Sequence, residues 1–423
     1  PPPCAACQRR LAGMTHAPRL PAFAVFAALL AAAGLPIYIH APKFYVDEYG
    51  VSLGALGAVL FGLRLLDVVQ DPLFGRLGDR LRDRRGLAVA VAAAVMALAM
   101  VGLFAVPPMG PPLVWFAAML TLVFSGFSFL TIVFYAQGVI SADRLPGQGH
   151  LRLARWRETG ALLGVCVASI APVALGLWMQ APFAGFAAGF VVLALAAVAM
   201  MRREWSGAGL PASTGLRAVL RDGLARRLLL IALLNAAPVA VTTTLFLFFV
   251  DARLEAGGKE GPLLLAFFLA AACAAPVWGV LAERHGPKRV LLAAMALSIL
   301  SLGGAVFLGA GDWAWFAVIC LVSGAALGAD LTLLPAIFAA RMAQISPGAT
   351  DGFGLWSFVS KFTLAFAAVT LLPALQAAGF NSAGDSPAAA LTLLAVLYAL
   401  VPCGLKLFAM ALLVATPIKG ALA

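Results

Sequence analysis

Charged residues are scarce in this sequence of 423 residues, since Asp, Glu, Lys and Arg together make up 11% of it. Hydrophobic residues make up 63%, and the mean hydropathy is +1.00. These values lie far outside the usual composition of soluble domains. The scarcity of charge therefore argues against an ordinary soluble protein and indicates an integral membrane protein.

Cysteine, histidine and catalytic motifs are also scarce. The six cysteines form no disulfide or zinc framework, because four are scattered singly within apolar stretches and Cys4 and Cys7 make one CxxC with no second pair. Only four histidines occur, and the sequence has no G-x-S-x-G, HExxH or Walker pattern. A membrane-embedded enzyme is thus the less favoured class, and we expect no enzyme activity and no cofactor.

Apolar stretches long enough to cross a bilayer fill most of the chain. A spanning helix needs about 20 mostly apolar residues, and about twelve such stretches occur. The expected spans are residues 20–42, 52–76, 87–107, 112–140, 159–179, 182–201, 228–250, 262–282, 289–309, 314–340, 353–378 and 388–416. They lack the alternating pattern of a membrane barrel, so the sequence predicts an all-α membrane protein.

The net charge of +11 is concentrated on one side of these spans. With an even number of spans, one set of loops and tails holds 23 of the 29 Lys and Arg residues, and the opposite set holds only Lys43, Arg253 and Lys259. Because basic loops remain in the cytoplasm, both termini are expected to be cytoplasmic. The basic residues are thus concentrated on one side of the membrane, and this distribution argues against nucleic acid as a partner.

The longest charged connection, residues 202–227, follows six spans and precedes six more. The sequence therefore predicts a cytoplasmic tail at 1–19, an N-terminal six-helix bundle at 20–201, a central loop at 202–227 and a C-terminal six-helix bundle at 228–423. Where two six-helix bundles are repeats of one another, a transported substrate is held between them near the middle of the membrane.

The two halves carry matching motifs, PLFGRLGDR and PVWGVLAER, at an offset of 204 residues. A small residue in each motif allows a neighbouring helix to approach closely, and the acid can form an ion pair at the helix ends. We interpret these residues as a conformational latch, with ordinary loop charges as the alternative. The latch residues are Gly75, Asp79, Arg80, Gly279, Glu283 and Arg284.

Two carboxylates, Asp67 and Asp71, lie four residues apart deep inside the second expected span. They share one helix face, about 6 Å apart, with Gln70 beside them and Arg64 one turn earlier. A carboxylate in the bilayer is costly, and the second half carries alanines at the equivalent positions, so the fold does not require the acids. The pattern favours a site for Na+ or H+, with a structural Arg64–Asp67 pair as the alternative.

These motifs resemble a known family. The GxxxDR loops and the six-plus-six repeat are similar to the major facilitator superfamily, over nearly the whole chain. The run R-x-x-D-x-x-x-D-P-x-x-G, from Arg64 to Gly75, resembles the glycoside–pentoside–hexuronide cation symporters, the melibiose-permease-like branch. The resemblance implies that Asp67, Gln70 and Asp71 bind the coupling cation.

The same resemblance assigns roles to two distant cations. FGLWSFVSKFTLAF is similar to the family's eleventh span, which carries a lone lysine at the place of Lys361, so Lys361 and Arg64 are expected to form a charge network with the acids. Arg157, at the start of the fifth span, matches an arginine that helps to hold substrate. Lys406 lies nearer the end of its span, and we expect it to extend to the membrane surface.

Further polar and aromatic residues in apolar surroundings are candidates for substrate binding, with packing as the alternative for each. The substrate-binding set is Tyr38, Thr131, Tyr135, Arg157, Asn235, Asp330, Trp356 and Lys361. Ala31 and Thr131 occupy positions where the family carries acids that grip sugar hydroxyls. This difference counts against a galactoside and leaves sodium, a proton or no coupled ion as alternatives.

The sequence thus predicts a secondary active transporter that couples Na+ or H+ to symport of a small polar organic solute, with a sugar or glycoside as the first candidate. A lysolipid carrier and an uncoupled uniporter of the same fold are the alternatives. The expected partners are the solute and the lipid bilayer, and the expected state is a monomer. The expected location is a bacterial inner membrane.

Overall fold

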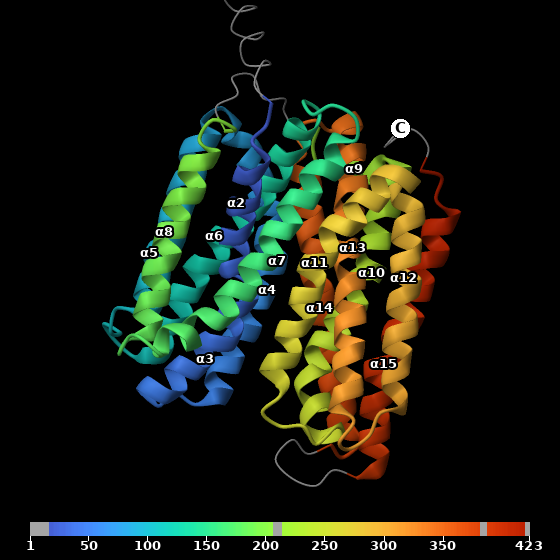
Figure 1. Ribbon diagram of the computed structural model, residues 1–423. Helices are drawn as coiled ribbons and strands as arrows, with labels where there is room; N and C mark the ends of the chain where they lie inside the picture. The colour runs from blue at the N-terminus through green and yellow to red at the C-terminus, as the bar shows by residue number, and fades with distance from the viewer. Residues whose placement is uncertain (1–16, 206–213, 381–386, 419–423) are drawn as a thin grey trace, which may run out of the picture. The chain divides into compact units, whose positions relative to one another are not determined.

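The computed structural model describes residues 17–205, 214–380 and 387–418 and contains only helices and connecting turns in those ranges. Figure 1 shows the helices. The expected all-α membrane fold is confirmed. Ten helices in the described part are long and apolar enough to cross a membrane, and α2 and α4 bring the total toward the twelve expected. Cys4 and Cys7 lie outside the described residues.

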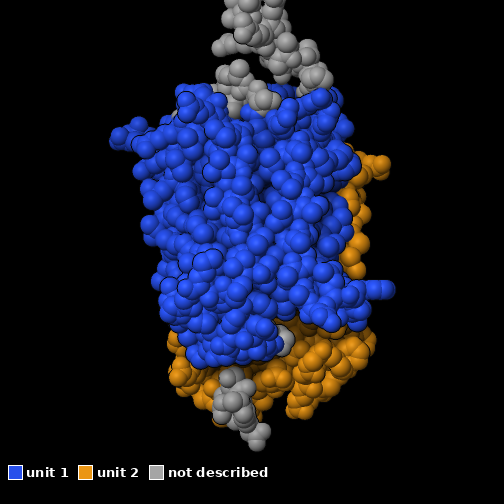
Figure 2. Space-filling view, turned by 90° about the vertical axis from the view of Figure 1, so that its left-hand side faces the viewer, with its two compact units in different colours: residues 1–222, 338–358 blue, residues 223–337, 359–423 orange. Residues whose placement is uncertain are grey.

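The chain forms two compact units, coloured separately in Figure 2. Unit 1 comprises Pro1–Asp222 and Phe338–Phe358, and unit 2 comprises Gly223–Ile337 and Val359–Ala423. The boundary at Gly223 falls inside the predicted central loop at 202–227. Unit 1 also includes the end of α13 and the start of α14, which come from the second half of the sequence.

Unit 1 contains the helices of the first half. They are α2 (Leu20–Ala32), α3 (Leu35–Tyr49), α4 (Leu53–Arg80), the short η1 (Arg82–Arg84), α5 (Arg85–Phe104), α6 (Pro112–Ala142), α7 (Gly149–Gly176), α8 (Pro182–Met201) and α9 (Leu216–Arg221). The remaining elements are α10 (Gly223–Phe248), η2 (Phe249–Arg253), α11 (Glu260–His285), α12 (Pro287–Gly304), η3 (Ala305–Phe307), α13 (Trp313–Ile345), α14 (Thr350–Ala377) and α15 (Ala388–Ala415).

The first expected span is not one continuous helix. It is divided into α2 and α3, and the break falls at Ala33 and Gly34. Gly34 has φ −93° and ψ −117°, outside the helical region. Pro36 follows two residues later and has no backbone N–H to continue the helix, which explains why the first expected span breaks here.

Two other boundaries differ from the sequence prediction. Helix α7 begins at Gly149, ten residues before the expected start of the fifth span, so Arg157 and its neighbours lie inside a helix and not at its beginning. The predicted central loop contains the short helix α9. Both segments are rich in arginine, and hydropathy alone assigns such stretches to loops.

Helices α2 and α7 of unit 1 pack with their backbones in direct contact. A Cβ at Gly160 would lie 2.2 Å from the carbonyl oxygen of Ala24, and a Cβ at Gly164 would lie 2.7 Å from the Cα of Ala28. These distances are too short for any side chain. The pattern Gly-x-x-x-Gly therefore brings the two backbones together, as small residues do in membrane helices.

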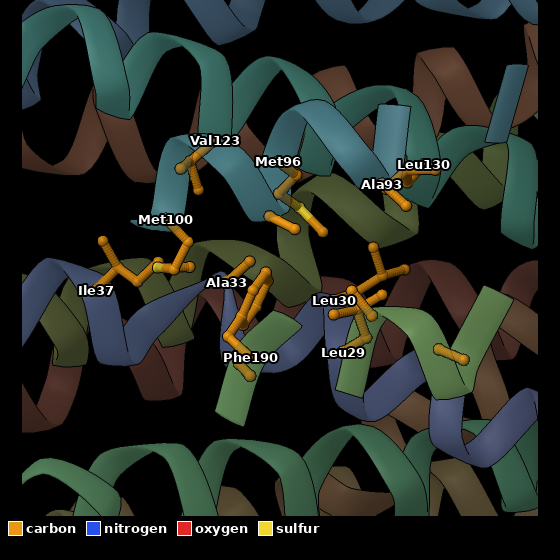
Figure 3. Packing of buried hydrophobic residues seen from close by; sticks show 14 of the residues in the cluster. Leu29, Leu30, Ala33, Ile37, Ala93, Met96, Met100, Val123, Leu130 and Phe190 are labelled. Carbon is orange, nitrogen blue, oxygen red and sulfur yellow. The ribbon is translucent and has the colours of Figure 1, made fainter. Parts of the chain in front are cut away.

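Unit 1 has a continuous apolar core between these helices. Figure 3 shows Ile37 of α3 close to Met100 of α5, with Phe190 of α8 next to Ala33. In unit 2 the rings of Phe249 and Tyr398 stack with their centroids 4.3 Å apart, where α10 and η2 pack against α15. Each unit is thus a packed helical bundle that can hold polar groups at fixed positions.

Candidate functional site

Asp67 and Asp71 lie on α4 and are buried in the protein. Their exposed fractions are 3% and 0%, so neither carboxylate faces lipid or solvent. The neighbouring Leu65, Leu66 and Val69 are exposed instead, at 40% or more. Helix α4 therefore has an apolar outer face and an acidic inner face, as expected from the spacing of four residues.

Asp67 belongs to a hydrogen-bonded group formed by α4 and α6. Gln70 Nε2 donates to Asp67 Oδ1 at 2.7 Å, and Ser128 Oγ of α6 donates to the same oxygen at 3.4 Å. The Gln70 Oε1 atom in turn accepts from Ser125 Oγ at 3.0 Å. Because the amide is bonded at both ends, Gln70 is held in one orientation beside the carboxylate.

Asp71 contacts α14. Ser357 Oγ donates to Asp71 Oδ2 at 2.6 Å, and both groups are buried. Glycines make this contact feasible, since a Cβ at Gly75 would lie 3.0 Å from the carbonyl oxygen of Thr350, and a Cβ at Gly354 would lie 3.2 Å from that of Asp71. The backbones of α4 and the start of α14 therefore meet directly at the acid pair.

The residues around the pair are oxygen donors. Two carboxylates, the Gln70 amide and the Ser128 and Ser357 hydroxyls lie on three helices of unit 1. Oxygen ligands suit hard cations, and two carboxylates about 6 Å apart in a buried place cannot both ionise at low cost. The chemistry of this arrangement fits either a small cation such as Na+ or a proton.

The expected charge network also includes Arg64 and Lys361. The Arg64 side chain lies outside the described part of the structure. Lys361 is half-buried on α14, one helical turn beyond Ser357, and belongs to unit 2. Its position in the helix, eleven residues after the start at Thr350, agrees with the expected location well inside a span.

A second polar cluster lies in unit 1, on α6 and α7. Arg157 Nε donates to Glu158 Oε1 at 2.7 Å, and the Arg157 guanidinium carbon lies 3.8 Å from the centre of the Tyr135 ring. The Tyr135 hydroxyl donates to the same Glu158 oxygen at 3.0 Å. Arg157 Nη2 is buried without a hydrogen-bond partner among the described residues. The structure thus brings two predicted substrate residues together around an acid.

The remaining predicted substrate residues of unit 1 lie nearby in the fold or outside its described part. The Trp356 ring packs 4.9 Å from Phe338, and Phe353, one turn earlier, packs 5.2 Å from Tyr135. Thr131 Oγ1 on α6 is buried with no hydrogen-bond partner among the described residues. The side chain of Tyr38 lies outside the described part of the structure.

Unit 2 holds Asn235 and Asp330, both buried. Asp330 on α13 forms an ion pair with Lys406 on α15, whose exposed fraction is only 2%. The prediction that Lys406 extends to the membrane surface is therefore wrong, because its side chain points into the bundle toward a carboxylate. Asp330 Oδ1 and Asn235 Oδ1 are buried without partners among the described residues.

The two latch motifs occupy the last turns of α4 and α11. Gly75 is covered by the start of α14, and Asp79 forms an ion pair with Arg82 at 3.8 Å. Arg80 and Arg284 are exposed, Gly279 is buried and Glu283 is half-buried. Gly75 therefore allows the close approach of a neighbouring helix that its small size predicts.

Sequence reasoning missed Ser125, Ser357 and Glu158. Serines are common in membrane helices, and no local pattern distinguishes those that face a carboxylate. Glu158 was detectable in principle, because it is an acid within ten residues of a long apolar stretch, but the late expected start of the fifth span placed it in a loop.

Comparison with known proteins agrees with this architecture. A sequence model of the family described as "MFS/sugar transport protein" matches residues 21–420. An Escherichia coli (strain K12) protein named as a glycoside/cation symporter, YagG, is 49% identical over 43 residues. That match covers 10% of this chain and 9% of the length of that curated relative.

Solved structures share the fold over most of the chain. A bacterial homologue of the iron transporter ferroportin, in an outward-facing state, superimposes with a TM-score of 0.67 at 14% identity and covers 94% of this chain and 99% of its own. A variant of the Escherichia coli fucose:proton symporter FucP gives a TM-score of 0.64 at 13% identity, with 92% and 98% covered. At these identities the likeness establishes the fold alone.

Proposed function

Because this chain belongs to the MFS/sugar transport protein family, we propose that it is a secondary active transporter that couples Na+ or H+ to symport of a small polar organic solute. The family is one of transporters, and the chain is an integral multi-pass membrane protein. The sugar or glycoside class is the proposed solute, in keeping with the family description and the short match to a glycoside/cation symporter.

One observation carries the proposal of coupling. Asp67 and Asp71 are buried on one face of α4 with Gln70, Ser128 and Ser357 around them. Two adjacent carboxylates in a low-dielectric place are stabilised by a bound cation or proton, which removes their repulsion. We propose that Asp67, Gln70 and Asp71 bind the coupling ion, and that Arg64 and Lys361 balance their charge.

The start of α14 offers a route from this ion site to a solute site. Ser357 contacts Asp71, and Phe353, one turn earlier on the same face, packs against Tyr135 of the Arg157 cluster. A change in the position of Asp71 on ion binding would therefore be transmitted through Ser357 and Phe353 to the Arg157 cluster. We propose that this helix couples the two sites during alternating access.

We propose further roles for the residues outside the ion site. Arg157 and Tyr135 contact the solute, with Tyr38, Thr131, Asn235, Asp330, Trp356 and Lys361 as further solute residues. The latch motifs hold one conformation closed. The protein works as a monomer in a bacterial inner membrane with both termini in the cytoplasm.

The test is ion binding by purified protein in liposomes. Tryptophan fluorescence would be followed during titration with Na+, Li+ and acid for the wild type, Asp67→Asn, Asp71→Asn and Lys361→Ala. Asp83→Asn is the matched control, because its side chain is 80% exposed outside the site. We expect a saturable response that is lost in Asp67→Asn and in Asp71→Asn and kept in Asp83→Asn.

The opposite results have a defined meaning. A wild-type protein without any ion response, or a response that is indifferent to both Asp changes, would refute the coupling site. An uncoupled uniporter or a lysolipid carrier would then be the better assignment. A solute uptake screen then separates these two assignments, because a uniporter moves a soluble solute whereas a lysolipid carrier does not.

A further inference from the structure

A cavity of about 740 Å³ lies in unit 1 beside the short helix α9. Arg217, Arg221, Leu216 and Leu220 of α9 line it, together with Arg76 from the end of α4 and Asp351 from the start of α14. The cavity is open toward solvent, and its volume lies within the range of about 300–1,000 Å³ that is usual for small-molecule sites. No residue of the ion site or the Arg157 cluster contributes to its lining.

The wall formed by α9 is fastened to the rest of unit 1 at both ends. Before the helix, the Thr214 backbone N–H donates to Ser346 Oγ at 3.1 Å, and Thr214 Oγ1 donates to the carbonyl oxygen of Ile345 at 3.3 Å. After the helix, Arg341 Nε donates to Asp222 Oδ1 at 3.0 Å. The cavity therefore has a defined wall, although α9 has only six residues.

The lining carries a surplus of positive charge. It contains three guanidinium groups and one carboxylate, and the nearby acid Asp222 is already bonded to Arg341. Among the residues that the structure describes, no acid forms an ion pair with Arg76, Arg217 or Arg221. Positive charges gathered around a concave surface attract an anion.

The type of cation and its surroundings narrow the class of anion. The planar guanidinium group donates two parallel hydrogen bonds to phosphate oxygens. Leu216 and Leu220 lie one turn apart on the same face of α9 and add an apolar part to the lining. The cavity lies at the end of unit 1 that carries the arginine-rich loops, and the charge pattern assigns this end to the cytoplasm. Anionic lipid headgroups and soluble phosphates both occur there.

We propose that this cavity binds a phosphate-bearing anion, either the headgroup of an anionic lipid or a soluble phosphate compound. Arg76, Arg217 and Arg221 hold the phosphate, and Leu216 and Leu220 contact its apolar portion. The site is separate from the proposed transport sites, so its existence does not depend on the coupling ion or the solute.

The experiment uses the full chain in two arms. In the lipid arm, protein from phosphatidylcholine nanodiscs doped with phosphatidylglycerol is examined by native mass spectrometry for retained phosphatidylglycerol. In the soluble arm, inorganic pyrophosphate and ATP are titrated against protein in phosphatidylcholine nanodiscs, with tryptophan fluorescence as the readout. Retention in the first arm identifies a lipid headgroup, and saturation in the second identifies a soluble phosphate.

The variant pair Arg217→Gln/Arg221→Gln tests the assignment. We expect about twenty-five-fold weaker binding in whichever arm is positive, since each of the two arginines near an anionic group contributes about fivefold. The control pair Arg226→Gln/Arg227→Gln removes the same charge from exposed positions at the start of α10, outside the lining, and should retain binding.

Two results would overturn the proposal. One is a wild-type protein that binds none of these probes in either arm, and the other is an equal loss of binding in the control pair. If the α9 variants lower the melting temperature, Arg76→Gln replaces them, because Arg76 lies on α4 and is exposed. Binding unchanged in Arg76→Gln would then overturn the proposal as well.

Discussion

The Ser357 hydroxyl donates a hydrogen bond of 2.6 Å to Asp71 Oδ2, although 286 positions separate the two residues in the sequence. Asp71 comes from α4 and Ser357 from α14, and both lie in unit 1. A carboxylate with zero exposure is thereby held in one orientation by a residue from the second half of the chain. This bond is the most direct structural reason to expect that ion binding and movement of α14 are linked.

Replacement of Ser357 by Ala should weaken the ion response. Hydrogen bonds to charged groups contribute about 1.5–3 kcal/mol, so loss of the bond that orients Asp71 should weaken apparent ion affinity about tenfold or more. Thr370→Ala is the control on the same helix, because its hydroxyl donates to the backbone carbonyl oxygens of Phe366 and Ala367 within α14. Fluorescence titration measures both, and an equal change in the two variants would contradict this role.

Arg157→Lys should reduce solute transport much more than Tyr135→Phe. Lysine keeps the charge but loses the planar group that lies 3.8 Å from the Tyr135 ring and bonds Glu158. Phenylalanine keeps the ring under the guanidinium and removes only the hydroxyl bond to Glu158. We expect about a tenfold or greater loss of uptake for the first change and a few-fold loss for the second. Equal losses would indicate that the cluster serves folding alone.

Gly75→Ala should destabilise the protein, whereas Gly62→Ala should not. A methyl group at Gly75 would meet backbone atoms of Thr350 and Asp351 at 3.0 and 3.4 Å, and overpacking of this kind costs about 1–3 kcal/mol. Gly62 lies on the same helix with nothing within 4 Å, where alanine improves helix propensity by up to about 1 kcal/mol. Thermal unfolding in detergent compares the two, and similar melting temperatures would rule out a tight α4–α14 contact.

Lys406→Met should be more damaging than the double change Asp330→Asn/Lys406→Met. Removal of one partner from a buried ion pair leaves an uncompensated charge and costs about 3–5 kcal/mol, whereas removal of both charges does not. The melting temperature of the double variant should therefore lie closer to that of the wild type. If the double variant melts below the single one, the pair contributes more than charge balance.

Much of the fold followed from the sequence because the bilayer demands long apolar helices, which hydropathy detects directly. The buried face of α4 was also predictable, since a spacing of four residues puts Asp67 and Asp71 on one side of a helix. Their burial at 3% and 0% confirms that placement. Their role in ion binding stays a prediction.

The remaining features depend on contacts between distant segments. Nothing local in the sequence indicates that Ser357 faces Asp71 or that Ser128 faces Asp67. Lys406 was misplaced because its distance along the span suggests an exit to the surface, whereas its direction is set by Asp330 on another helix. Hydropathy locates the apolar stretches along the chain but does not indicate which way a side chain points within the bundle.

The Asp330–Lys406 pair also has a consequence for the assembly of the protein during synthesis. Helix α13 reaches the membrane before α15, so Asp330 enters the bilayer without its partner, at a cost on the order of 2.5–3.5 kcal/mol for a charge at the centre of a helix. Arrival of α15 removes that cost. A nascent chain that stops before Ala388 would keep Asp330 without the lysine that neutralises it.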